Sequence, residues 1–449
     1  MNTNQFFKNV KINISLAYPI VLGQVSHVIT GMADTVMVGH IGSDYLAAAS
    51  FAHTIYMIIF LFGIGLGMGL TPLVGIANGE NNQHKSAIYF KNGLLIFTIS
   101  GFIIAGINLI ILPFFGLMGQ EENVAELAKP YFITLALSSI PYMVFITYKQ
   151  FTEGLSNTKP AMIISLACNL LNIILNYFLI YGIWIFPELK LLGAGIATLI
   201  ARITMAISFM VYFNFSENYK IYLKFLKSSK YSLVQIKMIL KLGIPIGLQF
   251  LLEITVFSVG AIMVGWSGKY SLAAHQIALT LASFTFLAAS GLASAGTIRL
   301  SNLLGERKFV ELKGVANSIF IMVAISMSIT AVIFYIFRFS IPLLFINEME
   351  VVEITGKLLI IAAFFQIFDG LQASAQGALR GIKDVKIPTF ISFISYWIVG
   401  ITSCYLLSET FELGAFGVWY GYLIALIVTS VLLLTRFYYI LNKTHKLTI

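Results

Sequence analysis

Long apolar stretches alternate with short polar segments along the whole chain, and this pattern predicts its elements. Each stretch has about 20 residues or more, the length that a helix needs to cross a bilayer. The twelve stretches are 12–38, 46–76, 88–114, 130–148, 160–184, 191–214, 242–266, 271–298, 315–345, 355–378, 388–407 and 414–436. The pattern predicts an all-α polytopic membrane protein with twelve transmembrane helices.

Composition supports a membrane protein and argues against several other classes. Hydrophobic residues make up 58% of the chain and charged residues only 10%, whereas soluble domains have about 25% charged residues. The two cysteines, Cys168 and Cys404, lie inside apolar stretches, so neither a disulfide framework nor a cysteine metal site is expected. The sequence has no Walker A motif and no HExxH motif. We therefore expect a protein that is not an enzyme and has no cofactor.

The net charge of +9 comes from an uneven distribution of basic residues. If the N-terminus is cytoplasmic, 22 of the 28 basic residues fall on the inward side and Arg202 falls within a span. The outward side then has Lys129, Lys190, Lys269, Arg338 and Lys357. This bias predicts that both termini are cytoplasmic, and it identifies the positive charge as an insertion signal rather than a nucleic-acid surface.

The two halves of the chain repeat one another at an offset of 226 residues. "MVGHIGSDYLAAA" (37–49) returns as "MVGWSGKYSLAAH" (263–275), and Pro19 returns as Pro245. The repeat predicts an N-lobe at 1–215 with helices 1–6, a basic cytoplasmic linker at 216–240, and a C-lobe at 241–449 with helices 7–12. Six spans are an even number, so the lobes share one orientation and are expected to enclose a central cleft.

Two prolines lie inside predicted helices. Pro19 and Pro245 remove a backbone donor and clash with the preceding turn, so each predicts a kink. The kink is either static or a hinge whose bend changes during transport.

Three of the nineteen acidic residues lie at membrane depth: Asp34, Glu253 and Asp369. Such a charge costs roughly 2.5–3.5 kcal/mol on insertion scales and marks a functional site by default. The repeat places Gly260 opposite Asp34 and His27 opposite Glu253, so the two lobes are expected to differ. Each acid is a candidate for proton exchange, since burial favours the neutral form, or for binding a hard cation such as Na⁺.

Amide and hydroxyl side chains provide further oxygen ligands. Asn172 and Asn176 share one helix face in the fifth span, and Thr198 follows in the sixth. They support a cation site or form hydrogen bonds between helices.

Several motifs resemble the multidrug and toxic compound extrusion (MATE) family, in particular its NorM-like branch. They are "DTVMVGHIGSDYLAAAS", "AAHQIALTLASFTFL", "GERKFVELK" and "FDGLQASAQGALRGIKDVKIP". The resemblance implies a V-shaped exporter with twelve helices, MOP-type parallel repeats and alternating access. It implies that Asp34 works with Asn172, Asn176 and Thr198. It also implies coupling acids in helices 7 and 10, which Glu253 and Asp369 match; the DinF-like branch lacks the helix 7 acid.

The family resemblance implies antiport of Na⁺ or H⁺ against organic, often cationic and aromatic compounds, for which the three acids are also candidate ligands. Some relatives have an aspartate at the position of Asn176, and proton-coupled members bend the first helix at a proline that Pro19 matches. We expect a monomer in a prokaryotic plasma membrane that binds lipid and small molecules but no nucleic acid. A lipid-linked saccharide flippase is the alternative, although it would be expected to have a more basic cavity.

Overall fold

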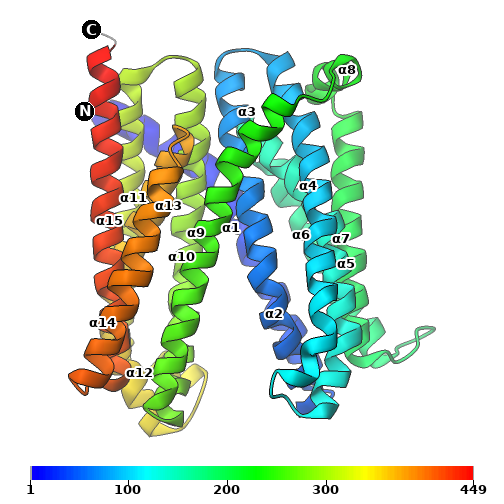
Figure 1. The fold of residues 1–449 in the computed structure, drawn as a ribbon, viewed down its shortest axis with the longest axis vertical. Coiled ribbons are helices and arrows are strands. Elements are labelled where there is room, and N and C mark those ends of the chain that lie inside the picture. The colour runs from blue at the N-terminus through cyan, green and yellow to red at the C-terminus, as the bar shows by residue number, and fades with distance from the viewer. Residues whose placement is uncertain (1–2, 448–449) are drawn as a thin grey trace. The chain divides into compact units, whose positions relative to one another are not determined.

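The computed structural model describes residues 3–447, with side chains described through Lys443, and this part of the chain is helical with no strand (Figure 1). Twelve segments are long and apolar enough to cross a membrane, which confirms the predicted fold class. The α-helices are α1 (Thr3–Gly39), α2 (Ser43–Met68), α3 (Leu70–Gly79), α4 (Gln83–Ile111), α5 (Glu122–Gly154), α6 (Lys159–Tyr181), α7 (Lys190–Phe215), α8 (Lys220–Ser228), α9 (Leu233–Trp266), α10 (Lys269–Gly305), α11 (Phe309–Ile336), α12 (Met349–Gly381), α13 (Lys386–Phe393), α14 (Ile401–Tyr405) and α15 (Gly414–Leu447).

Shorter helical pieces complete these spans. Three 3-10 turns are η1 (Leu112–Leu117), η2 (Glu217–Tyr219) and η3 (Pro342–Leu344), and two π-helical segments are η4 (Ile394–Gly400) and η5 (Leu406–Thr410). The repeated glycines Gly42 and Gly268 precede α2 and α10 with φ values of 150° and 100°. A residue with a Cβ is strained there, which explains why the turn "VGxxG" occurs in both halves.

The chain forms two compact units whose boundaries lie inside helices. The N unit comprises Leu22–Gly247, and the C unit comprises the residues through Val21 together with those from Leu248 onward. The two boundaries are one repeat length apart, so both halves of the chain are divided at the equivalent position. This division differs from the predicted one, because 216–240 lies inside the N unit and the first part of α1 lies in the C unit.

Polar and apolar contacts hold the first part of α1 in the C unit. Arg299 of α10 donates from Nη1 to Asn13 Oδ1 (2.7 Å) and from Nη2 to Asn9 Oδ1 (3.0 Å). Asn13 is fully buried and donates to Ser318 Oγ of α11 at 2.9 Å. Three apolar side chains of α1 also enter the core formed by α10, α11, α12 and α15: Leu16, Ala17 and Ile20.

The first part of α9 is held in the N unit by close backbone packing. A Cβ at Gly243 would meet the carbonyl oxygen of Leu66, and one at Gly247 would lie 2.8 Å from the carbonyl oxygen of Phe62. Glycine thus lets α9 approach α2 closely. Lys91 of α4 donates to the carbonyl oxygens of Leu226 (2.9 Å) and Ser229 (2.6 Å) in the preceding segment.

The two predicted kink prolines lie close to the unit boundaries. Pro19 and Pro245 each precede the boundary by two residues, and α1 and α9 continue through them as helices. Whether either bend changes during transport stays a prediction.

Candidate cation sites

The N unit brings the first candidate acid together with two of the predicted amides. Asp34 lies on the last third of α1, where Asn176 of α6 donates to its Oδ1. Both ends of the Asn172 amide form hydrogen bonds when its nitrogen faces the Asp34 carboxylate. It then donates to Asp34 Oδ1 (3.2 Å), and its oxygen accepts from the backbone N–H of Thr198 on α7 (3.1 Å). Three helices thus meet around Asp34.

A seam of polar contacts between α1 and α6 positions these groups. Asn169 donates to Ser26 Oγ at 2.8 Å, and the Tyr181 hydroxyl donates to the carbonyl oxygen of Met37 at 2.9 Å. These contacts flank the Asp34–Asn176 contact along both helices. Asn176 is fully buried, and its amide oxygen Oδ1 has no partner among the described residues. A carboxylate beside amide oxygens is a ligand set that suits a hard cation.

The C unit places the other two acids near one another. Glu253 lies on α9 and Asp369 on α12, and the two carboxylates interact electrostatically. Asp369 is 7% exposed, and its Oδ1 has no hydrogen-bond partner among the described residues. Gln372 lies beside Glu253. No ion pair between described residues includes either acid or Asp34.

The sequence reasoning missed two other buried polar side chains of the C unit. Gln249 is one turn before Glu253 on α9, and neither of its amide atoms has a partner within the described chain. Tyr396, in the π-helical segment η4, is buried and interacts electrostatically with both acids. Short π-helical segments such as η4 are frequent at functional sites. Unpaired oxygens around two acids fit a bound cation or a proton-exchanging group.

The structure buries Arg380, one of the 22 basic residues that the sequence places on the inward side. It is 8% exposed, donates from Nη2 to Gln376 Oε1 at 2.8 Å, and its charge acts on Glu253. A polar stripe on one face of α12 could have revealed this in the sequence, since its members recur every three or four residues. The stripe is Gln366, Asp369, Gln372, Gln376 and Arg380.

The structure explains why the C unit has no acid at the position equivalent to Asp34. That position is Gly260, and a Cβ there would overlap the hydroxyl and ring of Tyr422. The Tyr422 hydroxyl donates to the carbonyl oxygen of Phe257 (3.1 Å), and its ring lies near those of Phe257 and Trp419, at centroid distances of 5.0 and 6.1 Å. Aromatic side chains fill this part of the C unit, and its acids lie nearer the middle of α9 and α12.

The fit of Tyr422 against Gly260 predicts a stability effect. We expect Gly260→Ala to destabilise the protein by about 1–3 kcal/mol, because the added methyl group must displace a packed aromatic ring. Thermal unfolding of the purified protein measures the change. Gly265→Ala is the matched control on the same helix, since a Cβ there meets nothing within 4 Å. Equal melting temperatures for the two variants would contradict this packing argument.

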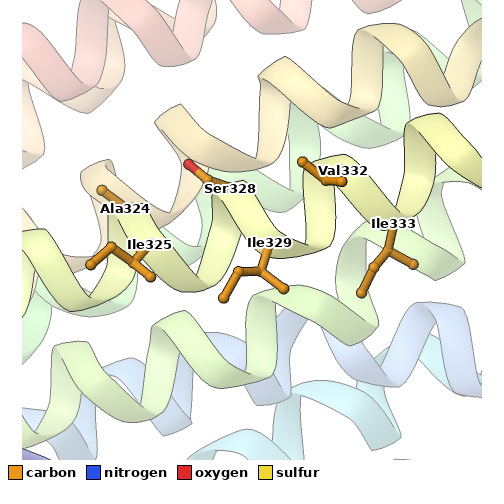
Figure 2. A pocket seen from close by; sticks show the side chains of 6 residues that line it. All are labelled: Ala324, Ile325, Ser328, Ile329, Val332 and Ile333. Atoms are coloured by element: carbon orange, nitrogen blue, oxygen red, sulfur yellow. The ribbon is translucent and has the colours of Figure 1, made fainter.

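The shallow pocket in Figure 2 does not coincide with these polar groups. All six side chains that line it come from α11, namely Ala324, Ile325, Ser328, Ile329, Val332 and Ile333. Ile329 and Val332 are each 57% exposed. An exposed apolar helix face of this kind is expected where a membrane protein meets lipid, and none of the three candidate acids lines it.

Comparisons with known proteins agree with the repeat and the fold. A profile of the MatE family matches residues 19–178 and again 245–406, and the starts of these two matches are separated by the repeat offset. The chain is 32% identical over 443 residues to the probable multidrug resistance protein NorM of Mannheimia succiniciproducens, covering 96% of this chain and 94% of the relative. It is 33% identical over 432 residues to the protein of the same description from Pasteurella multocida, covering 94% and 92%.

Solved structures share the fold at lower identity. The eukaryotic MATE transporter AtDTX14 superposes with a TM-score of 0.86 at 22% identity, covering 96% of this chain and 95% of that one. A MOP superfamily transporter from Pyrococcus furiosus gives a TM-score of 0.88 at 20% identity, covering 98% of both chains. The profile matches in both halves and the nearly full-length relatives show that this chain is a member of the MATE family, in its NorM-like branch.

Proposed function

We propose that this protein is a multidrug exporter that exchanges inward-moving Na⁺ or H⁺ for organic, often cationic and aromatic compounds. The main support is the pair of carboxylate sites at membrane depth, one in each unit, where amide groups lie beside acids that form no ion pair with any described residue. Ionisable groups at membrane depth mark ion or substrate pathways. The NorM relatives carry a multidrug resistance description, which supports the same substrate class.

Competition at the carboxylates couples the two fluxes. A cation that enters from outside occupies Asp34, Glu253 or Asp369 and removes the negative charge that attracts a cationic drug, so the drug leaves. The loaded protein then opens inward, releases the cation and binds drug from the cytoplasm. Linkage requires that the drug weaken cation binding as much as the cation weakens drug binding. This exchange takes place in a prokaryotic plasma membrane, with both termini on the cytoplasmic side.

Proteoliposome efflux of a fluorescent organic cation tests the proposal, with a Na⁺ gradient and a pH gradient applied separately. We expect at least one gradient to drive export by the unmodified protein. The triple variant Asp34→Asn, Glu253→Gln, Asp369→Asn is expected to match protein-free liposomes. Gradient-driven export by the triple variant would contradict the carboxylate mechanism. Absence of export of any organic cation by the unmodified protein would contradict the function and favour the saccharide flippase.

A further inference from the structure

A buried arginine in the N unit has no acidic partner. Arg202 of α7 is 8% exposed, and no carboxylate of the described residues forms an ion pair with it. Its guanidinium donates from Nη1 to the Tyr56 hydroxyl and to Ser138 Oγ (2.8 Å). A buried charge that is not paired is costly, so its retention in a membrane helix needs an explanation.

Aromatic ring faces surround the Arg202 guanidinium. Its carbon Cζ lies 4.6 Å from the ring centroid of Phe60, 4.9 Å from that of Tyr142 and 5.5 Å from that of Tyr56. Such contacts stabilise a cation without neutralising it. The positive charge is therefore held in place and remains available to act on its surroundings.

Helix α7 connects Arg202 to the Asp34 site. Thr198 precedes Arg202 by one turn of α7, so the two share a helix face. The backbone N–H of Thr198 donates to Asn172, whose amide nitrogen faces Asp34. The charges of Arg202 and Asp34 interact electrostatically.

We propose that Arg202 is the fixed counter-charge of the Asp34 site, which stabilises the ionised carboxylate after its cation has left and keeps cation affinity low enough for release. The inference rests on the proposed function and names the residue that sets the cation affinity of the Asp34 site. With Asp34 ionised, the two charges cancel. With a cation bound, this cluster carries one net positive charge, and that excess favours release.

The C unit has a different balance of charges. Arg380 acts on Glu253, and Asp369 is a second acid beside them. When both acids are ionised, one arginine faces two carboxylates, and the cluster retains a negative charge. We therefore expect the Asp34 site to bind a given cation more weakly than the C unit does.

Other ionisable groups around Arg202 and Asp34 come from neighbouring helices. His27 on α1 and His53 on α2 both interact with Arg202, and Tyr131 on α5 interacts with Asp34. Lys149 on α5 acts on His27. Because all of them contribute to the local potential, the test changes Arg202 and leaves these four residues in place.

The experiment measures cation affinity at Asp34 alone, in a Glu253→Gln, Asp369→Asn background. Equilibrium binding of radioactive Na⁺ to purified protein in nanodiscs reports Na⁺. Proton binding at Asp34 is measured from the infrared band of its protonated carboxyl group, after subtraction of the spectrum of the Asp34→Asn variant. We expect Arg202→Met to raise the affinity for H⁺ about tenfold, because a nearby positive charge is lost. The same rise is expected for Na⁺ if the Asp34 site binds Na⁺. Arg202→Lys keeps the positive charge, and its cation affinity is expected to stay within about threefold of the parent.

Two outcomes would overturn the proposal: an unchanged affinity in Arg202→Met, or equal affinities in the Met and Lys variants. If Arg202→Met does not fold, Arg202→Gln supplies the neutral variant, and thermal unfolding establishes that each protein is intact. Drug export is not used as a readout, so the proposed function can fail separately. Tighter cation binding in the neutral variant would support the counter-charge even if the triple variant still exported drug.

Discussion

Asp34→Asn is expected to abolish cation-driven export from a protein that still folds. The asparagine retains an oxygen that accepts from Asn176 and Asn172, so the contacts among α1, α6 and α7 remain. What disappears is the negative charge that holds the cation. The loss of one partly buried charge–charge interaction is on the order of 3 kcal/mol, which corresponds to about a 100-fold weaker cation affinity. Proteoliposome efflux driven by each gradient measures the loss.

Asp44→Asn is the matched control for this prediction. Asp44 lies at the start of α2, is exposed, and its carboxylate accepts from Asn123 at 2.9 Å. The same chemical change there is expected to leave export unchanged. If Asp34→Asn exported as well as Asp44→Asn, the N unit carboxylate would have no part in coupling.

Glu253→Gln and Asp369→Asn are each expected to reduce gradient-driven export about tenfold or more, and the double variant is expected to be little worse than the poorer single variant. The two carboxylates act on one another, and groups that work as one unit give strongly non-additive losses. A double-mutant cycle on the export rate measures the interaction, which we expect to be about 1–2 kcal/mol.

Glu353→Gln provides the control for this cycle. Glu353 is on the same helix as Asp369 but is exposed and pairs with Lys357 at 2.7 Å. An exposed pair of this kind contributes little, so export should not change. Losses at Glu253 and Asp369 that add fully would contradict a shared site and indicate two independent ones.

Much of the fold follows from the sequence alone. The twelve spans can be predicted because a helix that crosses a membrane needs a long apolar stretch, and the repeat can be found because its turns need glycine. The acids Asp34, Glu253 and Asp369 are conspicuous for the same reason: charge at membrane depth is rare. The helix face shared by Asn172 and Asn176 was also visible as a four-residue spacing.

The rest could not be predicted, because it depends on packing between distant segments. The repeat indicated that Gly260 replaces Asp34, but not that Tyr422 from α15 fills the space. The positive-inside rule assigns Arg380 to the cytoplasmic side, but the rule gives no sign that contacts with Gln376 and Phe250 bury the side chain. The division of the chain inside α1 and α9 was not predictable either, since a continuous apolar helix gives no sign that its two ends belong to different units.

That division has a consequence for biosynthesis. Asn13 of α1 leaves the ribosome long before its partners, because Arg299 and Ser318 follow it by 286 and 305 positions. The first part of α1 therefore stays in the bilayer without these hydrogen-bond partners of Asn13 until most of the chain has been made. The amino-terminal half produced alone would present an incomplete surface to lipid and to the quality-control machinery. Two half-chains divided near residue 231 would each hold a segment that the other needs, and co-expression should let them assemble as an obligate pair.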